Sequence, residues 1–284
     1  MAADNFTVHT MSREEVGFAI ELAAKEGWNP GLHDAALFHA ADPHGFFLGK
    51  LDGEPIGCIS NVIYDPSFAF LGLYIVRPDF RGRGFGLRLW KAAMDYAGPR
   101  NVGLDGVIAQ QENYKRFGFR LAYRNIRFQG TRIGGRLTRH HPTRELAAIP
   151  FEELERYDRA FFPAPRTRFL RKWVVQPDGR AVGVADCTGN MVGYGVIRTC
   201  RTGFKIGPLF ADSEPVAETL LSELAEFAGN APVFLDVPEV NPAAVNLATR
   251  CDMEIVFETA RMYSREQPSL PFDRTFGVTT FELG

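Results

Sequence analysis

The segment Arg81–Gly86 concentrates residues that could bind an anion, because glycines alternate there with two arginines. It follows the largely apolar run Phe68–Val76, which indicates a buried strand. An amphipathic helix follows, with apolar residues recurring on one face. Glycines allow a tight turn and a close approach of backbone to ligand. The helix N-terminus offers free N–H groups and its positive dipole end, and arginines add charge-assisted donors. We therefore expect a pyrophosphate cradle.

Three phosphate-binding patterns compete for this segment. The P-loop pattern GxxxxGK[ST] occurs nowhere in it, and the dinucleotide pattern GxGxxG fails in both registers. Counted from Gly82, the third glycine falls on Leu87, and counted from Gly84 it falls on Leu89. The pattern [Q/R]xxGx[G/A] remains, filled by Arg81, Gly84 and Gly86.

A second element lies about thirty residues further along. Tyr114–Phe119 reads Tyr-x-x-x-Gly-Phe, and Val76 and Pro78 precede the glycine loop. Together these features resemble the GNAT acetyltransferase superfamily, closely over Leu73–Leu89. The loop combined with the tyrosine element is a more specific signal than the loop alone.

The resemblance implies a site for acetyl-CoA at a notch where the strand before the loop separates from the next strand. The strand would contact the pantetheine arm, the loop would bind the pyrophosphate, and the tyrosine would lie near the thioester sulfur. The residues implied to bind acetyl-CoA are Tyr74, Ile75, Val76, Arg81, Gly82, Arg83, Gly84, Phe85, Gly86, Asn113 and Tyr114.

The same resemblance implies two catalytic groups. An attacking amine must lose a proton and the leaving thiolate benefits from receiving one, which the Tyr114 hydroxyl can donate. The backbone N–H of Val76 can stabilise the tetrahedral oxyanion. Tyr114 could instead be a packing residue. The base stays open between Asp105, Glu112 and water, and Asp105 could equally serve in a local pair or cap.

One position departs from the family pattern. The family often has an asparagine seven residues before the tyrosine, where this chain has Val107. Gln110, Gln111 and Asn113 are nearby polar residues that could replace it. The departure affects the contacts that the resemblance implies to the pantetheine amides. It does not affect the assignment of the glycine loop.

The order of elements indicates an internal duplication. Val76–Phe80 matches Ile206–Phe210, and Leu104-Asp105 matches Leu235-Asp236, in the same order and about 130 residues apart. We predict an α+β fold with α/β layers: two tandem GNAT-like domains, each a mixed, mostly antiparallel sheet flanked by helices. The domains are residues 1–135, which bind acetyl-CoA, and residues 136–284, which are degenerate and complete the substrate pocket or support the fold. Arg144–Ile149 is predicted as the first strand of the second domain.

The second copy lacks the cofactor groups. Glu214 replaces Gly84 and Val216 replaces Gly86, so a carboxylate would repel pyrophosphate and a β-branched side chain would block backbone approach. We therefore predict one acetyl-CoA per chain. Residues that follow a strand end in this half are candidates for holding an amine, against ordinary turn and cap roles. They are Asp236, Glu239 and Asn241.

Composition limits the classes of binding partner that the sequence favours. The net charge of −2 favours neither nucleic acid nor an anionic membrane, and no apolar run reaches the ~20 residues of a membrane helix. Met1–Ser12 has no signal-peptide pattern, and the scattered cysteines have no metal-binding spacing, so we expect a cytoplasmic monomer or homodimer without metal.

The predicted function is transfer of an acetyl group from acetyl-CoA to a primary amine of a small molecule, by direct attack in a ternary complex. One alternative is acetylation of a protein or peptide amine. Another is an acyl-CoA-sensing module without turnover.

Overall fold

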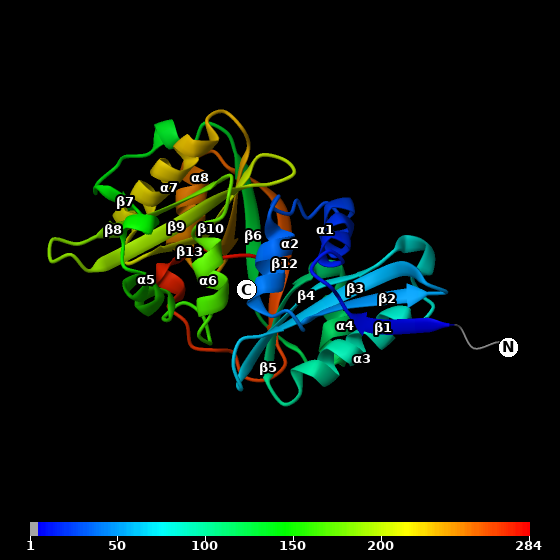
Figure 1. Ribbon diagram of the computed structural model, residues 1–284. Coiled ribbons are helices and arrows are strands. Elements are labelled where there is room, and N and C mark those ends of the chain that lie inside the picture. Colours follow the sequence, from blue (N-terminus) through cyan, green and yellow to red (C-terminus); the bar gives the residue numbers. More distant parts are fainter. Residues whose placement is uncertain (1–4) are drawn as a thin grey trace.

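The computed structural model describes residues 5–284 and contains strands and helices in alternation (Figure 1). The strands are β1 (Phe6–Thr10), β2 (Phe46–Leu51), β3 (Glu54–Ile63), β4 (Phe68–Val76), β5 (Asn101–Val107), β6 (Arg120–Gly130), β7 (Thr143–Glu145), β8 (Gly179–Ala185), β9 (Met191–Thr199), β10 (Phe204–Ala211), β11 (Val233–Pro238), β12 (Glu254–Tyr263) and β13 (Thr275–Gly277). The α-helices are α1 (Val16–Lys25), α2 (Asp34–Ala41), α3 (Phe85–Ala97), α4 (Gln111–Arg116), α5 (Phe151–Asp158), α6 (Thr167–Trp173), α7 (Glu214–Ala228) and α8 (Pro242–Arg250).

All strands of residues 5–284 belong to one mixed sheet. Its order is β1-β2-β3-β4-β5-β12-β6-β11-β10-β9-β8-β7, and β13 pairs with β10. The predicted α+β class is confirmed, since helices flank a mixed sheet to which both halves of the chain contribute. The two sheets are joined, however, because β12 of the second half lies between β5 and β6 of the first. Figure 1 shows β6 and β12 side by side between the halves.

The β5–β12 contact is an antiparallel ladder from Thr259↔Val107 to Tyr263↔Gly103. Its centre holds a buried ion pair, with Arg261 Nη2 2.6 Å from Asp105 Oδ2. Asn125 Nδ2 of β6 donates to Asp105 Oδ1 at 2.8 Å. Side chains of two neighbouring strands, β6 and β12, thus satisfy one buried carboxylate of β5, which fixes the register between the halves.

Several local structures follow from the sequence. Ser12 and Glu15 form a reciprocal capping box before α1, with Glu15 N–H donating to Ser12 Oγ at 3.2 Å and Ser12 N–H donating to Glu15 Oε2 at 3.0 Å. The prediction of a strand at Arg144–Ile149 was too long. Only Thr143–Glu145 pairs, with β8, and Leu146–Ala148 forms a 3₁₀ turn.

Helices of both halves share a core against the sheet. α1 and α2 of the first half and α5 and α6 of the second contribute to one apolar cluster, in which Phe38 and Trp173 stack at 6.4 Å between ring centroids. α3 packs on β2–β4 and α7 on β8–β10 in separate clusters. No helix in the part of the chain that the structure describes is long and apolar enough to cross a membrane.

A second buried ion pair joins β6 to β11. Arg127 Nε lies 2.6 Å from Asp236 Oδ1 and Nη2 lies 2.8 Å from Oδ2, a bidentate arrangement with both side chains almost fully buried. Removing one member of such a pair by substitution lowers the stability of the protein, because the remaining charge stays buried without compensation.

We predict that Arg127→Met lowers the free energy of unfolding by about 3–5 kcal/mol, because it leaves the Asp236 carboxylate buried and unpaired. Urea unfolding followed by circular dichroism measures this. The double variant Arg127→Met/Asp236→Leu should recover most of the loss, since it removes both charges. A wild-type unfolding free energy for the single variant would contradict this account of the β6–β11 contact.

Candidate active site

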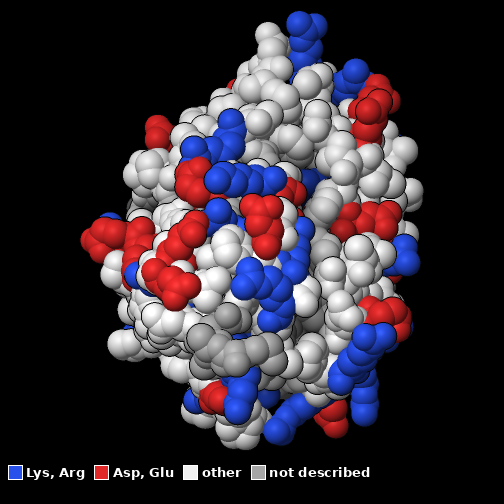
Figure 2. All heavy atoms as spheres, turned by 90° about the vertical axis from the view of Figure 1, so that its right-hand side faces the viewer, with Lys and Arg blue, Asp and Glu red and all other residues white. Residues whose placement is uncertain are grey.

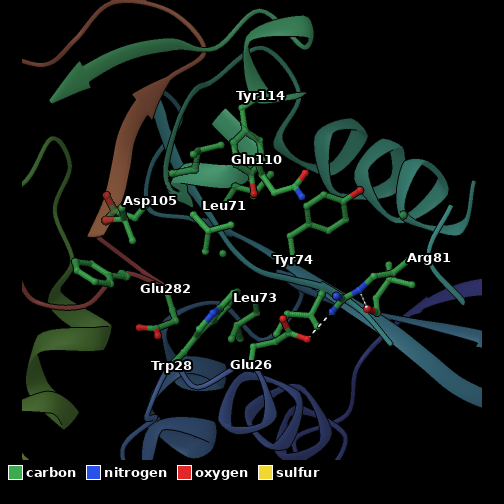
Figure 3. A pocket seen from close by; sticks show the side chains of 18 of the residues that line it. Glu26, Trp28, Leu71, Leu73, Tyr74, Arg81, Asp105, Gln110, Tyr114 and Glu282 are labelled. Atoms are coloured by element: carbon green, nitrogen blue, oxygen red, sulfur yellow. Dashed lines mark hydrogen bonds and ion pairs between the residues drawn. The ribbon is translucent and has the colours of Figure 1, made fainter. Parts of the chain in front are cut away.

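The candidate site begins where β4 and β5 part. The two strands pair in parallel only from Phe68↔Asn101 to Leu71↔Leu104. Leu73 then takes a left-handed backbone conformation (φ +47°), a strained choice for a leucine, where the register with β3 shifts. A cavity of about 400 Å³ opens between the separated strands (Figure 3).

The geometry of β4 directs backbone groups away from β3. Arg77 N–H donates to Ile56 O at 2.8 Å, and Val76 is the partner of Gly57 in the next pair of this antiparallel ladder. Neighbouring pairs alternate in hydrogen bonding, so the Val76 N–H and C=O point toward the opening. In agreement, Val76 O accepts from Arg81 Nε at 2.7 Å. The N–H assigned to the oxyanion is therefore free of the β3 ladder.

The loop after β4 has the shape of an anion cradle. Gly82 and Gly84 have φ of +74° and +84°, with nothing within 4 Å of the position of a Cβ atom. Gly84 is the N-cap of α3, so the first N–H groups of the helix face the loop. At Gly86 a Cβ atom would lie 2.7 Å from Tyr74 Oη. These positions fit the pyrophosphate of acetyl-CoA, because glycine leaves the backbone accessible.

The other loop side chains are placed differently. Arg81 Nη2 lies 2.5 Å from Glu26 Oε1 of the α1–α2 connection, at the mouth of the cavity. The Arg83 guanidinium stacks over the Phe85 ring at 4.9 Å and does not line the cavity. Phe85 itself is buried against Phe6 at 4.8 Å. In this structure only Arg81 of the two arginines reaches the cavity.

Tyr114 lines the cavity from α4. Its ring packs against Trp90 at 5.8 Å, and Gly106 makes room for it, because a Cβ atom there would overlap the ring. Burial raises the pKa of Tyr114, so the hydroxyl holds its proton as a donor must. Tyr74 lines the same wall, and burial raises its pKa as well.

The residues that could replace the missing asparagine divide into two groups. Gln110 lines the cavity, as does Val107 at the position of the asparagine, whereas Gln111 does not. Asn113 is exposed and donates from Nδ2 to Gln110 Oε1 at 2.6 Å, so it acts on the cavity only through that contact.

The base candidates have fixed partners. Asp105 lines the cavity, but both of its oxygens accept from Arg261. Burial raises the pKa of Asp105, against the effect of Arg261. Glu112 is exposed on α4 and pairs with Lys115 at 2.7 Å, outside the cavity. The geometry therefore shows Asp105 in a local pair with Arg261, which was one of the two roles that the sequence left open for it.

The structure does not bring the predicted amine-binding residues of the second half to this cavity. Asp236 is the partner of Arg127, and Glu239 Oε1 accepts from Arg124 N–H at 2.9 Å. Asn241 caps α8 through bonds from Ala243 and Ala244 N–H at 3.1 and 3.2 Å. Asp236 therefore holds two strands together through an ion pair, whereas Glu239 and Asn241 have the local turn and cap roles that were the alternative.

The second half lacks an open notch. β10 and β11 pair from Phe204 to Ile206 and then part, as β4 and β5 do. Here β13 fills the gap, pairing Gly277 with Leu209, and Val278 N–H donates to Asp236 O at 2.8 Å. Val216 at the start of α7 is buried in the core. The chain's own C-terminal segment thus occupies the place that would correspond to the pantetheine.

Sequence reasoning missed the acceptor end of the cavity. It is formed by Trp28 from the α1–α2 connection, Phe257 and Thr259 of β12, and Phe281 and Glu282 of the C-terminal tail. In Figure 3 Glu282 and Asp105 lie at the end opposite Arg81. These residues belong to no motif. Trp28 comes from the first half itself, and the strand exchange brings the other four residues here.

Comparison with known proteins identifies the class. Residues 13–119 match the acetyltransferase (GNAT) family profile, and residues 154–277 match an acetyltransferase (GNAT) domain profile. Holothin acyltransferase of Pseudoalteromonas sp. is 31% identical over 98% of this chain and 95% of its own length. The protein is therefore a member of the GNAT acetyltransferase family, with two GNAT domains in tandem. The boundary near residue 135 stays a prediction, since neither match reaches it.

Solved structures agree on the fold. A putative acetyltransferase from Pyrococcus horikoshii superposes with a TM-score of 0.84 at 22% identity, covering 100% of this chain and 98% of that one. A tandem GNAT protein from the clavulanic acid biosynthesis pathway gives a TM-score of 0.64 at 16% identity, covering 93% of this chain and 100% of that one. The tandem arrangement therefore occurs in other proteins.

We predict that Gly84→Glu raises the Kd for acetyl-CoA by at least about 100-fold, since the carboxylate would repel the pyrophosphate and the backbone favours glycine. Isothermal titration calorimetry measures this. Gly53→Glu is the matched control, because Gly53 has φ +86° and an open Cβ position in the β2–β3 turn, away from the cavity. Unaltered affinity in the Gly84 variant would refute the loop as the cradle.

Proposed function

We propose that this acetyltransferase transfers the acetyl group of acetyl-CoA to a primary amine of a small molecule, by direct attack in a ternary complex. The observation that carries the proposal is the cavity at the β4–β5 separation. Its donor end has the glycine loop, Tyr74 and Tyr114, and its acceptor end is closed by β12 and the C-terminal tail.

The enclosure favours a small acceptor over a protein. The acceptor end is bounded by Trp28, Phe257 and Phe281, which suit a compact, largely apolar molecule. A volume of about 400 Å³, shared with the acyl-pantetheine arm, leaves little room for a peptide segment. On the face drawn in Figure 2, basic and acidic side chains are interspersed, without the one-signed surface that would attract an oppositely charged protein segment.

The residues support direct attack. The amine nitrogen attacks the thioester carbon, and the Val76 N–H stabilises the oxyanion that forms. As the C–S bond breaks, the sulfur receives a proton from the Tyr114 hydroxyl. Among the described residues no cysteine lines the cavity, and burial raises the pKa of the Cys58 thiol. A cysteine-bound acyl intermediate therefore has no support in this geometry.

The relative named holothin acyltransferase makes holothin a direct acceptor to test. The similarity extends along the whole chain, including the second half that forms the acceptor end. A non-catalytic acyl-CoA sensor would not need an acceptor end with polar groups, which favours the enzyme.

We expect free CoA to be released from acetyl-CoA when the protein is given holothin or small apolar primary amines. Peptide N-termini and lysine peptides should give at most about a tenth of that rate. Thiol detection with Ellman's reagent and mass spectrometry of the amide measure this. Binding of acetyl-CoA without turnover of any amine would favour the sensor, and faster turnover of peptides would favour the protein acceptor.

We predict that Tyr114→Phe lowers kcat by about 100-fold, in the range for loss of a general acid, and changes the KM for acetyl-CoA by less than about threefold. Burial raises the pKa of Tyr114 above its usual value of about 10, so wild-type kcat should not fall up to about pH 9. Tyr157→Phe is the control, because Tyr157 binds Asp212 away from the cavity. An unchanged kcat for Tyr114→Phe would remove the proton-donor role.

A further inference from the structure

Glu282 is a buried carboxylate at the acceptor end of the cavity without a partner for one of its oxygens. The residue is 4% exposed, and its Oε2 atom is buried with no hydrogen-bond partner among residues 5–284. A buried carboxylate oxygen without a donor is unfavourable, so such groups are normally hydrogen-bonded or paired. Among residues 5–284, no donor lies within hydrogen-bond distance of this oxygen.

The neighbouring charged groups do not supply that donor. Of the other two carboxylates that line the cavity, Asp105 pairs with Arg261 and Glu26 pairs with Arg81. Of the cations whose charge acts on Glu282, Arg127 is held bidentately by Asp236, and Lys205 Nζ donates to Trp28 O at 3.1 Å. Arg198 Nε donates to Asp34 at 3.1 Å, and its two Nη atoms also lack partners among the described residues.

The backbone of the tail is fixed, so Glu282 has a defined position. The N–H groups of Glu282 and Leu283 donate to Thr280 Oγ1 at 3.2 and 2.9 Å. Tyr64 Oη donates to Leu283 O at 2.9 Å, which binds the tail to the first half. Gly72, the first residue of β4 beyond its pairing with β5, has no side chain because a Cβ atom would overlap the Glu282 carbonyl.

These contacts place Glu282 directly where the notch opens. Phe281 and Phe257 pack together at 6.3 Å beside it, and Leu71 and Leu73 lie between the acceptor end and the loop in Figure 3. A ligand at this end would meet the Glu282 carboxylate beside the apolar side chains of Phe257 and Phe281. An ammonium group on an apolar body has the complementary chemistry.

We propose that Glu282 binds the acceptor amine and takes its proton before transfer. The inference rests on the proposed function, whose substrate class it narrows to apolar molecules with a primary ammonium group. The ammonium gives one proton to the Glu282 carboxylate, and the freed electron pair forms the C–N bond while the C–S bond breaks toward sulfur. The second nitrogen proton goes to the sulfur by way of Tyr114. The products are amide and CoA thiol, and Glu282 returns its proton to solvent.

The test compares Glu282→Gln with wild type on two acceptors. Benzylamine is an ammonium ion at neutral pH and must lose a proton before attack, whereas aniline is already neutral. We expect kcat/KM to fall by about 100-fold or more for benzylamine and by less than about fivefold for aniline. The Kd for acetyl-CoA should change by less than about twofold, and Glu282→Asp should retain part of the benzylamine activity.

The control is Glu266→Gln, the same change at an exposed position of the tail outside the cavity. It should leave both activities at the wild-type value. Glu282→Gln should keep the circular dichroism spectrum of the folded wild type, because no hydrogen bond to Glu282 Oε2 is lost. An equal loss for both amines, no loss, or loss of acetyl-CoA binding would overturn the proposal and assign Glu282 a structural role.

A second measurement separates this proposal from the proposed function. If wild type acetylates neither amine, the proposed function loses its support, and calorimetric binding of benzylamine to the CoA-bound protein decides on Glu282. Binding at least about tenfold tighter in wild type than in Glu282→Gln would support the amine site. Equal binding, or none in wild type, would overturn it.

Discussion

The contact between β5 and β12 is the constraint on which the rest of the structure depends. Five residue pairs, with the buried Arg261–Asp105 ion pair among them, place a strand of the second half inside the first. β6 is thereby displaced to pair with β11, so each half completes its sheet with a strand of the other. Neither half presents a closed sheet by itself, which explains why a degenerate second copy is retained as part of the fold.

The same exchange produces the difference between the two notches. Both halves have a pair of parallel strands that part after a few residues, β4 from β5 and β10 from β11. The chain leaving β12 returns through the second notch as β13 and then reaches the first with Phe281 and Glu282. One tail therefore fills the notch that lacks a glycine cradle and closes the acceptor end of the notch that has one.

Most charged side chains at and near the cavity are paired with a charge of opposite sign. Arg261 neutralises Asp105, and Asp236 neutralises Arg127, so these groups hold strands together. Three carboxylates line the cavity, those of Glu26, Asp105 and Glu282. Of these, only Glu282 has a buried oxygen without a hydrogen-bond partner among residues 5–284. At the donor end, Arg81 is held by Glu26 and by the Val76 carbonyl, which keeps the loop in place beside the N-terminus of α3.

The sequence by itself determined the family and the tandem α+β fold, and it singled out the glycine loop and Tyr114, which lie beside one cavity. These depend on local rules: glycines where φ is positive, a helix start after a buried strand, and a short helix that is followed by Gly118 in a left-handed conformation. Only the tertiary structure decided the acceptor end. Which strand lies next to β5 is set by long-range pairing, for which β6 and β12 are chemically similar candidates. Asp236, Glu239 and Asn241 lie at or just after the end of β11, where open sheets place ligands. In the folded chain they instead form an ion pair, a hydrogen bond to backbone and a helix cap. Glu282 belongs to no motif, and only the path of the C-terminal tail in the folded chain brings it to the cavity.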